Sequence, residues 1–254
     1  MEPVAPRGEG AAPMAEQLLA RAGAPALMRA ALVQLLEARP PEPLRFLEEL
    51  FGAVAQGGPE APSAERALWY LRLAPYTRRT AFNNNVSMAY ECLCSAGRKK
   101  KPGLNGRAYS ELLSRLCKEA KLPGEVTSPL LKKIRCRDHE AVPFDIFRYG
   151  TLTCFVLLEY MTKAGALYDL LSDSGAVDER VGLAVLETLE EALEASDCLV
   201  PASYLEAGSK LGPDSLALAM DKALLAKKPS SSMHREEFLG KAAALFLAKV
   251  KATH

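Results

Sequence analysis

Histidine and tryptophan are scarce in this chain of 254 residues, which holds three histidines and one tryptophan. Histidine is the side chain that most often moves protons near neutral pH, and it is also a common metal ligand. Only His139 has a cysteine nearby, at Cys136, and one such pair at a helix end is typical of ordinary structural residues. The sequence therefore predicts no metal site and no cofactor.

The chain also lacks paired cysteines. Its six cysteines are scattered without a CxxC spacing: Cys92, Cys94, Cys117, Cys136, Cys154 and Cys198. Cys92 and Cys94 have one residue between them, which places them on different sides of a helix. We interpret the cysteines as small buried side chains in a protein of a reducing compartment.

Long apolar runs are missing as well. The longest run, from Thr151 to Met161, is shorter than the roughly 20 residues that a membrane span needs, and it contains Glu159. The first residues include Glu2 and Arg7 and hold no apolar core of the signal-peptide kind. We therefore expect neither secretion nor a membrane as a partner.

No motif of a catalytic site is present. The chain has no GxGxxG fingerprint and no GxSxG nucleophile elbow. The glycines at Gly103 and Gly106 lack the lysine and the spacing of a phosphate-binding loop. Acidic pairs such as Glu190-Glu191 lie on expected helices and are typical of solvated faces. We expect no catalytic residue and no enzymatic activity.

What the chain does contain is apolar residues at helical spacing along most of its length, which predicts an all-α fold. We expect a disordered start over residues 1–12, a helical hairpin over residues 14–52, a linker rich in glycine and proline over residues 53–64, and a multi-helix bundle over residues 65–254. The expected helices after the hairpin are 64–73, 78–94, 107–120, 129–134, 144–171, 178–196, 201–211, 213–227 and 235–250.

Local signals set some of these boundaries. Ser128 followed by Pro129 is typical of a helix start. Asp178 puts a negative charge at the beginning of another helix, where it interacts favourably with the helix dipole. Residues 152–158 contain types that suit a strand, but the length of the segment and the absence of hairpin turns favour a helix.

Three consecutive asparagines, Asn83, Asn84 and Asn85, fall within an expected helix. Each costs about 0.6 kcal/mol relative to alanine in a helix interior, or about 2 kcal/mol together. Either one of them caps a helix start, or their amides bind the backbone of a partner. We expect capping for one of the three.

Charge is distributed unevenly, although the net charge is only +1. Residues 97–137 contain twelve basic and three acidic side chains, whereas residues 138–254 carry a net charge of −7. Such a segment attracts acidic partners, but solvated helix faces or pairing with the acidic half explain it equally well. The candidate residues for binding an acidic partner form two runs: Arg98, Lys99, Lys100 and Lys101, then Lys132, Lys133, Arg135 and Arg137.

The chemistry of such an acidic partner is open to two interpretations. Nucleic acid is one polyanion, but Tyr90 and Tyr109 do not alternate with the basic residues as stacking platforms would. A glutamate-rich protein surface uses the same electrostatics without aromatic side chains. We therefore favour an acidic protein over nucleic acid, and a basic nucleic-acid-binding adaptor is the alternative.

The expected hairpin consists of two short amphipathic helices joined by a proline corner. The second helix begins at Pro43, and its expected buried positions are Leu44, Phe46, Leu47, Leu50 and Phe51. Each helix is too short to be stable alone, so the hairpin must pack against something. The hairpin resembles the docking and dimerisation module of the regulatory subunit of cyclic-AMP-dependent kinase. The residues that carry this resemblance are Leu32, Leu35, Leu36, Pro40, Pro43, Phe46, Leu47 and Phe51.

A second resemblance covers nearly all of residues 65–254. Long blocks, in order along the chain, are similar to the family of tubulin polyglutamylase complex subunit 1. Examples are Ala67-Leu68-Trp69-Tyr70-Leu71-Arg72-Leu73-Ala74, Cys136-Arg137-Asp138-His139-Glu140-Ala141-Val142-Pro143 and Gly150-Thr151-Leu152-Thr153-Cys154-Phe155-Val156-Leu157-Leu158-Glu159.

This second resemblance implies a non-catalytic scaffold and targeting subunit. Its implied partners are a tubulin tyrosine ligase-like catalytic subunit, the other subunits of the complex, and tubulin in microtubules. The implied locations are the cytoplasm and cytoskeleton, including the axoneme and basal body of cilia, centrioles, sperm flagella and neurons. No catalytic residues are implied for this subunit.

Overall fold

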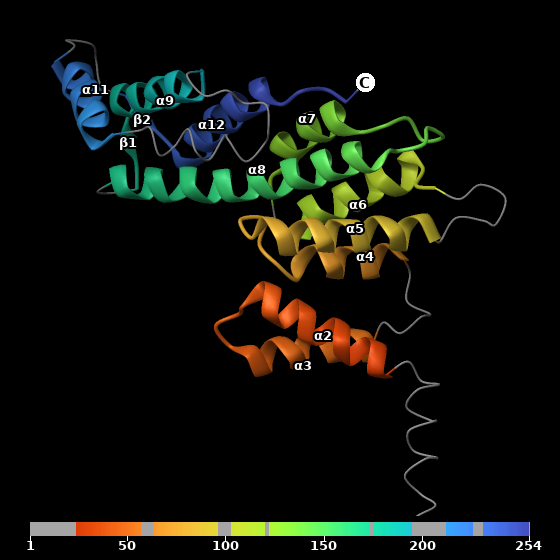
Figure 1. Ribbon diagram of the computed structural model, residues 1–254. Coiled ribbons are helices and arrows are strands. Elements are labelled where there is room, and N and C mark those ends of the chain that lie inside the picture. The colour runs from red at the N-terminus through yellow and green to blue at the C-terminus, as the bar shows by residue number, and fades with distance from the viewer. Residues whose placement is uncertain are drawn as a thin grey trace, which may run out of the picture. The chain divides into compact units, whose positions relative to one another are not determined.

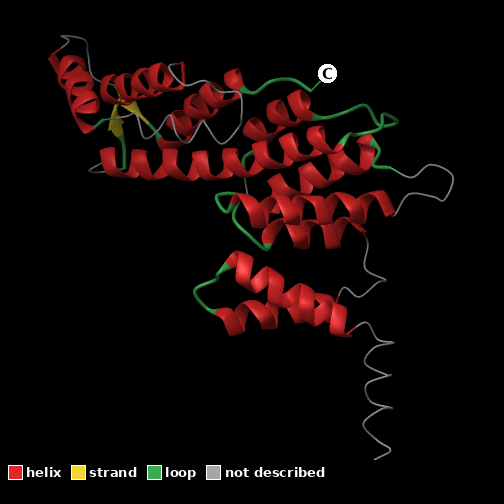
Figure 2. Cartoon of the chain, viewed as in Figure 1, coloured by secondary structure: helices red, strands yellow, loops and turns green. Residues whose placement is uncertain are grey.

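The computed structural model describes residues 24–56, 63–95, 103–119, 122–172, 175–194, 212–225 and 231–253. The expected disordered start, the expected helix over 201–211 and the basic run Arg98–Lys101 lie outside these residues. Most of the described chain is helical, as Figure 2 shows, which confirms the all-α prediction. The chain divides into two compact units, Met1–Asn85 and Val86–His254.

The first unit contains α2 (Ala24–Ala38), α3 (Pro43–Gln56), α4 (Ser63–Arg72) and the start of α5 (Arg79–Ser95) (Figure 1). Helices α2 and α3 pack against each other as a helical hairpin, with Ala31 and Leu50 buried. Residues 14–23 of the hairpin expected over 14–52 lie outside the described residues. Arg39 ends α2 in a left-handed conformation, with φ of 41°, and its amide donates to the carbonyl of Leu35. The expected linker over 53–64 overlaps the end of α3 and the start of α4, and residues 57–62 lie outside the described part.

The asparagine run lies inside α5, so the expectation that one asparagine caps a helix is wrong. Helix α5 begins at Arg79, four residues before Asn83. Phe82, Val86, Ala89 and Leu93 are buried at helical spacing, and their burial continues the helix through the asparagines. Asn85 shares this buried side, whereas Asn83 and Asn84 are exposed.

The second unit is organised around α8 (Phe144–Leu171), whose bounds match the predicted 144–171. At 28 residues it is about 42 Å long, long enough to carry two sets of neighbours. The two helices α6 (Gly106–Glu119) and α12 (Arg235–Lys249) both pack against it, and α7 (Gly124–Ile134) contacts both α6 and α12. Even α8 lacks a stretch apolar enough to span a membrane, and no other described helix has one.

A short antiparallel sheet joins the parts of the second unit that follow α8. Strand β1 (Val177–Asp178) pairs with β2 (Ser232–Met233), and each strand precedes a helix: β1 comes before α9 (Glu179–Glu194), and β2 before α12. Asp178 caps α9 by accepting a hydrogen bond of 2.9 Å from the amide of Arg180, in agreement with the predicted role of its negative charge. Helix α11 (Pro213–Leu225) packs on α9.

Helix α7 begins earlier than predicted. It runs from Gly124 to Ile134, so Pro129 lies inside it and the expected start at residue 129 is wrong. Val126, Leu130 and Ile134 lie four residues apart and are all buried. Burial of Val126 favours the additional N-terminal turn, and this tertiary contact outweighs the local start signal at Ser128 and Pro129.

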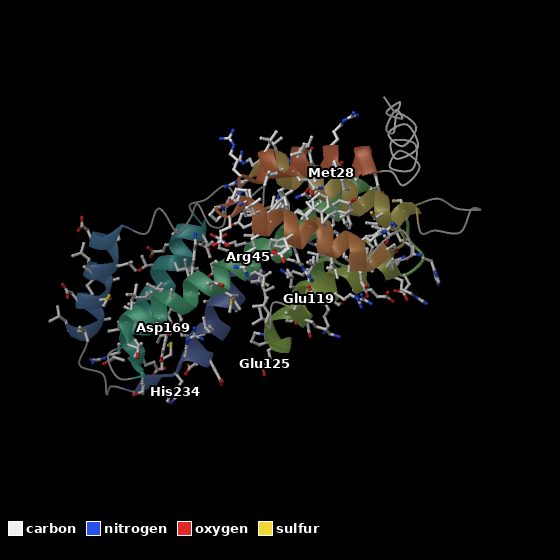
Figure 3. The ribbon with its side chains drawn as sticks, turned by 90° about the horizontal axis from the view of Figure 1, so that it is seen from below. Met28, Arg45, Glu119, Glu125, Asp169 and His234 are labelled. Carbon is white, nitrogen blue, oxygen red and sulfur yellow. The ribbon has the colours of Figure 1, made fainter. Side chains whose placement is uncertain are left out.

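Buried tyrosines join the helices of the second unit through their hydroxyl groups. Tyr160 of α8 donates to the carbonyl of Ala242 in α12 at 3.0 Å, and Tyr168 donates to the carbonyl of Met233 in β2 at 2.8 Å. The rings of both tyrosines also contact phenylalanines of α12. Asp169, near the C-terminal end of α8, forms an ion pair of 3.1 Å with Arg235 at the start of α12. Figure 3 labels Asp169 and the adjacent His234.

The substitution Tyr160→Phe is expected to lower the free energy of unfolding by about 1 kcal/mol, because it removes a buried hydrogen bond while keeping the ring. Urea denaturation followed by circular dichroism measures this change. Thr162→Ala is the control, since its exposed hydroxyl bonds only within α8. An equal loss in both variants would contradict the bridging role of Tyr160.

Candidate functional site

The exposed side of α2 forms an apolar surface, which we call the hairpin face. Its members are exposed by 52%, 53%, 47% and 71%, and they are Met28, Leu32, Val33 and Leu36. Met28, Leu32 and Leu36 recur every four residues, so they lie along one stripe of the helix. Figure 3 labels Met28 on α2 and Arg45 on α3.

The predicted docking residues divide into two groups. Leu32 and Leu36 lie on the hairpin face, and Pro43 is also exposed. The other predicted residues are half-buried within the first unit: Leu35, Pro40, Phe46, Leu47 and Phe51. Sequence reasoning missed Met28 and Val33, although the spacing of Met28 from Leu32 was a usable signal.

Leu44 is 84% exposed, so its expected burial in the hairpin is wrong. It lies six residues before the buried Leu50, about 120° away around α3. That offset turns Leu44 away from the side of α3 that packs on α2. The hairpin thus exposes large apolar side chains on both of its helices, a feature typical of protein-binding surfaces.

A second surface consists of exposed cations at the end of α7, which we call the basic corner. Its members are Lys132, Arg135, Arg137 and Lys251. The segment that contains Lys251 is held at the end of α7, because the amide of Thr253, two residues later, donates to the carbonyl of Lys133 at 3.1 Å. Among the described residues, no carboxylate forms an ion pair with these four side chains.

Lys133 differs from the other residues of the second basic run, because its ammonium group forms hydrogen bonds within the protein. It donates to the carbonyls of Leu247 and Val250 at 2.6 and 3.3 Å. These carbonyls lie at the C-terminus of α12, where a cation is favourable because the helix dipole is negative there. The exposed part of the second basic run is therefore Lys132, Arg135 and Arg137.

The turn that begins α6 lies against the segment that follows the second basic run. The amide of Gly106 donates to the carbonyl of Glu140 at 2.9 Å, and the amide of Val142 donates to that of Leu104 at 2.9 Å. Asn105 caps α6 by accepting a bond of 2.9 Å from the amide of Ala108. The residues that follow the first basic run along the chain are thus bonded to those that follow the second.

Gly106→Ala is expected to lower the free energy of unfolding by about 3 kcal/mol, because an added Cβ would lie 2.0 Å from the backbone carbonyl oxygen of Arg137. A backbone atom cannot rotate away as a side chain can, so the turn must open. Thermal denaturation measures the loss. Gly124→Ala is the control, since nothing lies within 4 Å of its added Cβ, and equal stability of the two variants would contradict the contact.

Burial and local hydrogen bonds shift the pKa values of several tyrosines and cysteines in the described part of the chain. Burial raises the pKa of Tyr109, whose hydroxyl donates to the carbonyl of Ile134 at 3.0 Å. The Sγ atoms of Cys117 and Cys154 lie 3.9 Å apart, and their hydrogen bond lowers the pKa of Cys117 and raises that of Cys154. Burial favours the neutral thiol of Cys136 over the thiolate, and this raises the pKa of Cys136.

The described residues contain no group of three histidine, cysteine, aspartate or glutamate side chains placed to hold a metal ion. Their notable surfaces are instead the apolar hairpin face and the cationic basic corner. Exposed apolar and cationic surfaces of these kinds are typical of sites where proteins bind one another.

Comparison with known proteins identifies the family. Residues 59–251 match the family model described as "Tubulin polyglutamylase complex subunit 1-like, C-terminal". The chain is 56% identical over 261 residues to the tubulin polyglutamylase complex subunit 1 of Homo sapiens, covering 96% of this chain and 90% of that protein. No solved structure is significantly similar to it. The chain belongs to the tubulin polyglutamylase complex subunit 1 family.

Proposed function

We propose that this chain is a non-catalytic scaffold and targeting subunit of a tubulin polyglutamylase complex. The observation that carries the proposal is the 56% identity to a protein named as a subunit of that complex, over 96% of the chain. Sequences this similar over their whole length share a fold. The exposed surfaces of the structure then give the proposed role its physical basis.

The hairpin face supports a role in assembly. Four large apolar side chains on one side of α2 are 47–71% exposed, and covering them with a partner subunit removes apolar surface from water. The proposed partners are a tubulin tyrosine ligase-like catalytic subunit and the other subunits of the complex. In this assignment the ligase supplies the chemistry, and this chain holds it in place.

The basic corner supports a role in targeting. Lys132, Arg135, Arg137 and Lys251 present positive charge to solvent, which accelerates encounters with acidic chains. The glutamate-rich tails of tubulin are the proposed acidic partner. The proposed locations are those that the family resemblance implies: the cytoplasm and cytoskeleton, including the axonemes and basal bodies of cilia, centrioles, sperm flagella and neurons.

The test is recovery of the full chain from a lysate of ciliated cells, with co-purified proteins identified by mass spectrometry. Recovery of a tubulin tyrosine ligase-like enzyme is the expected result, and glutamate ligation to tubulin is expected in the recovered complex but not with the purified chain alone. Recovery of RNA-binding proteins without a ligase would overturn the proposal. Filter binding of single-stranded RNA to the purified chain is the direct check on that alternative.

A further inference from the structure

A pocket in the first unit contains an unusual concentration of arginine. It lies where α2 ends and α5 begins, and its volume is about 570 Å³. Its lining residues are Leu36, Arg39, Arg78, Arg79, Thr80 and Ala81. Three of the six are arginines and none is acidic, so the lining carries an excess of positive charge in a small space.

Arg78 lines this pocket, and one of its hydrogen-bond donors has no acceptor. Its Nη2 atom donates to the carbonyl of Arg39 at 3.1 Å, which holds the guanidinium group in place. Its Nη1 atom has almost no accessible surface and no hydrogen-bond partner. A buried charged donor without an acceptor is costly. An anion in the pocket would interact favourably with the positive charge of the same guanidinium group.

The start of α5 adds a second set of donors. Arg79, Thr80 and Ala81 form its first turn, whose amides have no acceptor within the helix, whereas the amide of Phe82 already bonds the carbonyl of Arg78 at 2.9 Å. This first turn contains no acidic residue that would neutralise the positive end of the helix dipole. Free amides, a helix N-terminus and guanidinium groups together are suited to bind an oxyanion.

We propose that this pocket binds a phosphate group, either free phosphate or the phosphate of a phosphorylated serine or threonine. A phosphate carries between one and two negative charges and three acceptor oxygens, so it satisfies several arginine and amide donors at once. A single carboxylate brings less charge and fewer acceptor positions. The pocket is separate from the hairpin face except for Leu36, and the inference does not depend on the proposed place of the chain in a complex.

Isothermal titration of the full chain with inorganic phosphate, O-phosphoserine and glutamate tests the proposal at constant ionic strength. Both phosphate compounds are expected to bind, and glutamate is expected to bind at least about tenfold more weakly. Tighter binding of O-phosphoserine than of inorganic phosphate would identify a phosphorylated side chain as the ligand, and the reverse order would identify free phosphate. Failure of both to bind, or glutamate binding as tightly, would overturn the proposal.

Substitutions locate the binding in this pocket. Arg78→Gln and Arg79→Gln are each expected to weaken phosphate binding at least about tenfold, because each removes charge-assisted donors. Arg78→Gln also removes the bond to Arg39, so Arg79→Gln, at an exposed position, tests the site with the least change to the fold. Arg29→Gln, an exposed arginine of α2 outside the pocket, is the matched control. Equal affinities in Arg79→Gln and Arg29→Gln would contradict the assignment.

Discussion

Leu32→Asp is expected to remove the chain from its complex while leaving the chain folded. Leu32 is 53% exposed at the centre of the hairpin face, so a carboxylate there stays hydrated in the free protein. In an assembled interface the same carboxylate would be buried without a partner, which costs several kcal/mol. We expect at least a 100-fold loss of affinity for the partner subunit, which corresponds to about 3 kcal/mol.

Affinity purification of the variant from ciliated cells, with the yield of each co-purified subunit compared with the wild type, measures this loss. Leu218→Asp is the matched control, because Leu218 is 60% exposed on α11 and lies away from the hairpin. Circular dichroism verifies that both variants are folded. Unchanged subunit yields for Leu32→Asp would exclude the hairpin face as an assembly surface.

Phe46→Asp does not separate assembly from folding. Phe46 is half-buried in the hairpin, so aspartate at this position also destabilises the packing of α2 on α3. Leu32→Asp is therefore the more informative variant, because its effect on assembly is not accompanied by loss of the hairpin. Leu36→Asp is less specific than Leu32→Asp, since Leu36 also lines the arginine pocket.

A triple variant of the basic corner, Lys132→Gln, Arg135→Gln and Arg137→Gln, is expected to weaken binding to microtubules at least about tenfold at low ionic strength. All three side chains are exposed, so the loss comes from their charges rather than from packing. Cosedimentation with microtubules over a series of salt concentrations measures the affinity. The difference from wild type is expected to shrink as salt rises, because the Debye length falls to about 8 Å at 0.15 M.

The control for net charge is a triple variant at three lysines elsewhere in the second unit. Lys163→Gln, Lys222→Gln and Lys241→Gln remove the same charge from exposed positions outside the basic corner. Equal binding by the two triple variants would show that position does not matter and would contradict the assignment of the corner. Lys133 is left unchanged in both, because its ammonium group stabilises the end of α12.

The sequence predicted the helices best where many apolar residues repeat. Helix α8 runs from Phe144 to Leu171 as predicted, because a segment of 28 residues contains enough repeats to fix its period and its ends. Both ends of α5 and the start of α9 differ from the prediction by one residue. The start of α7 was missed, because the local signal at Ser128 and Pro129 was weaker than the burial of Val126.

The candidate surfaces were predictable in part. The spacing of Leu32 and Leu36 and the excess of basic residues in 97–137 are properties of the sequence itself. The hydrogen bonds of the Lys133 ammonium group were not predictable from the sequence. The carbonyl groups that accept them belong to Leu247 and Val250, which are more than 100 residues away along the chain. A similar separation along the chain explains why the sequence did not predict Lys251 as a member of the basic corner.

By itself the sequence determined an all-helical chain, the hairpin, the uneven charge and the family, since each depends on residue types and their order. Only the tertiary structure decided which apolar side chains remain exposed and which cations remain available to a partner. It also brought Arg39, the residue after α2, together with Arg78 and Arg79 at the start of α5 in one pocket. The physical reason is that exposure and pairing depend on contacts between residues far apart in the chain, and local periodicity carries no information about those contacts.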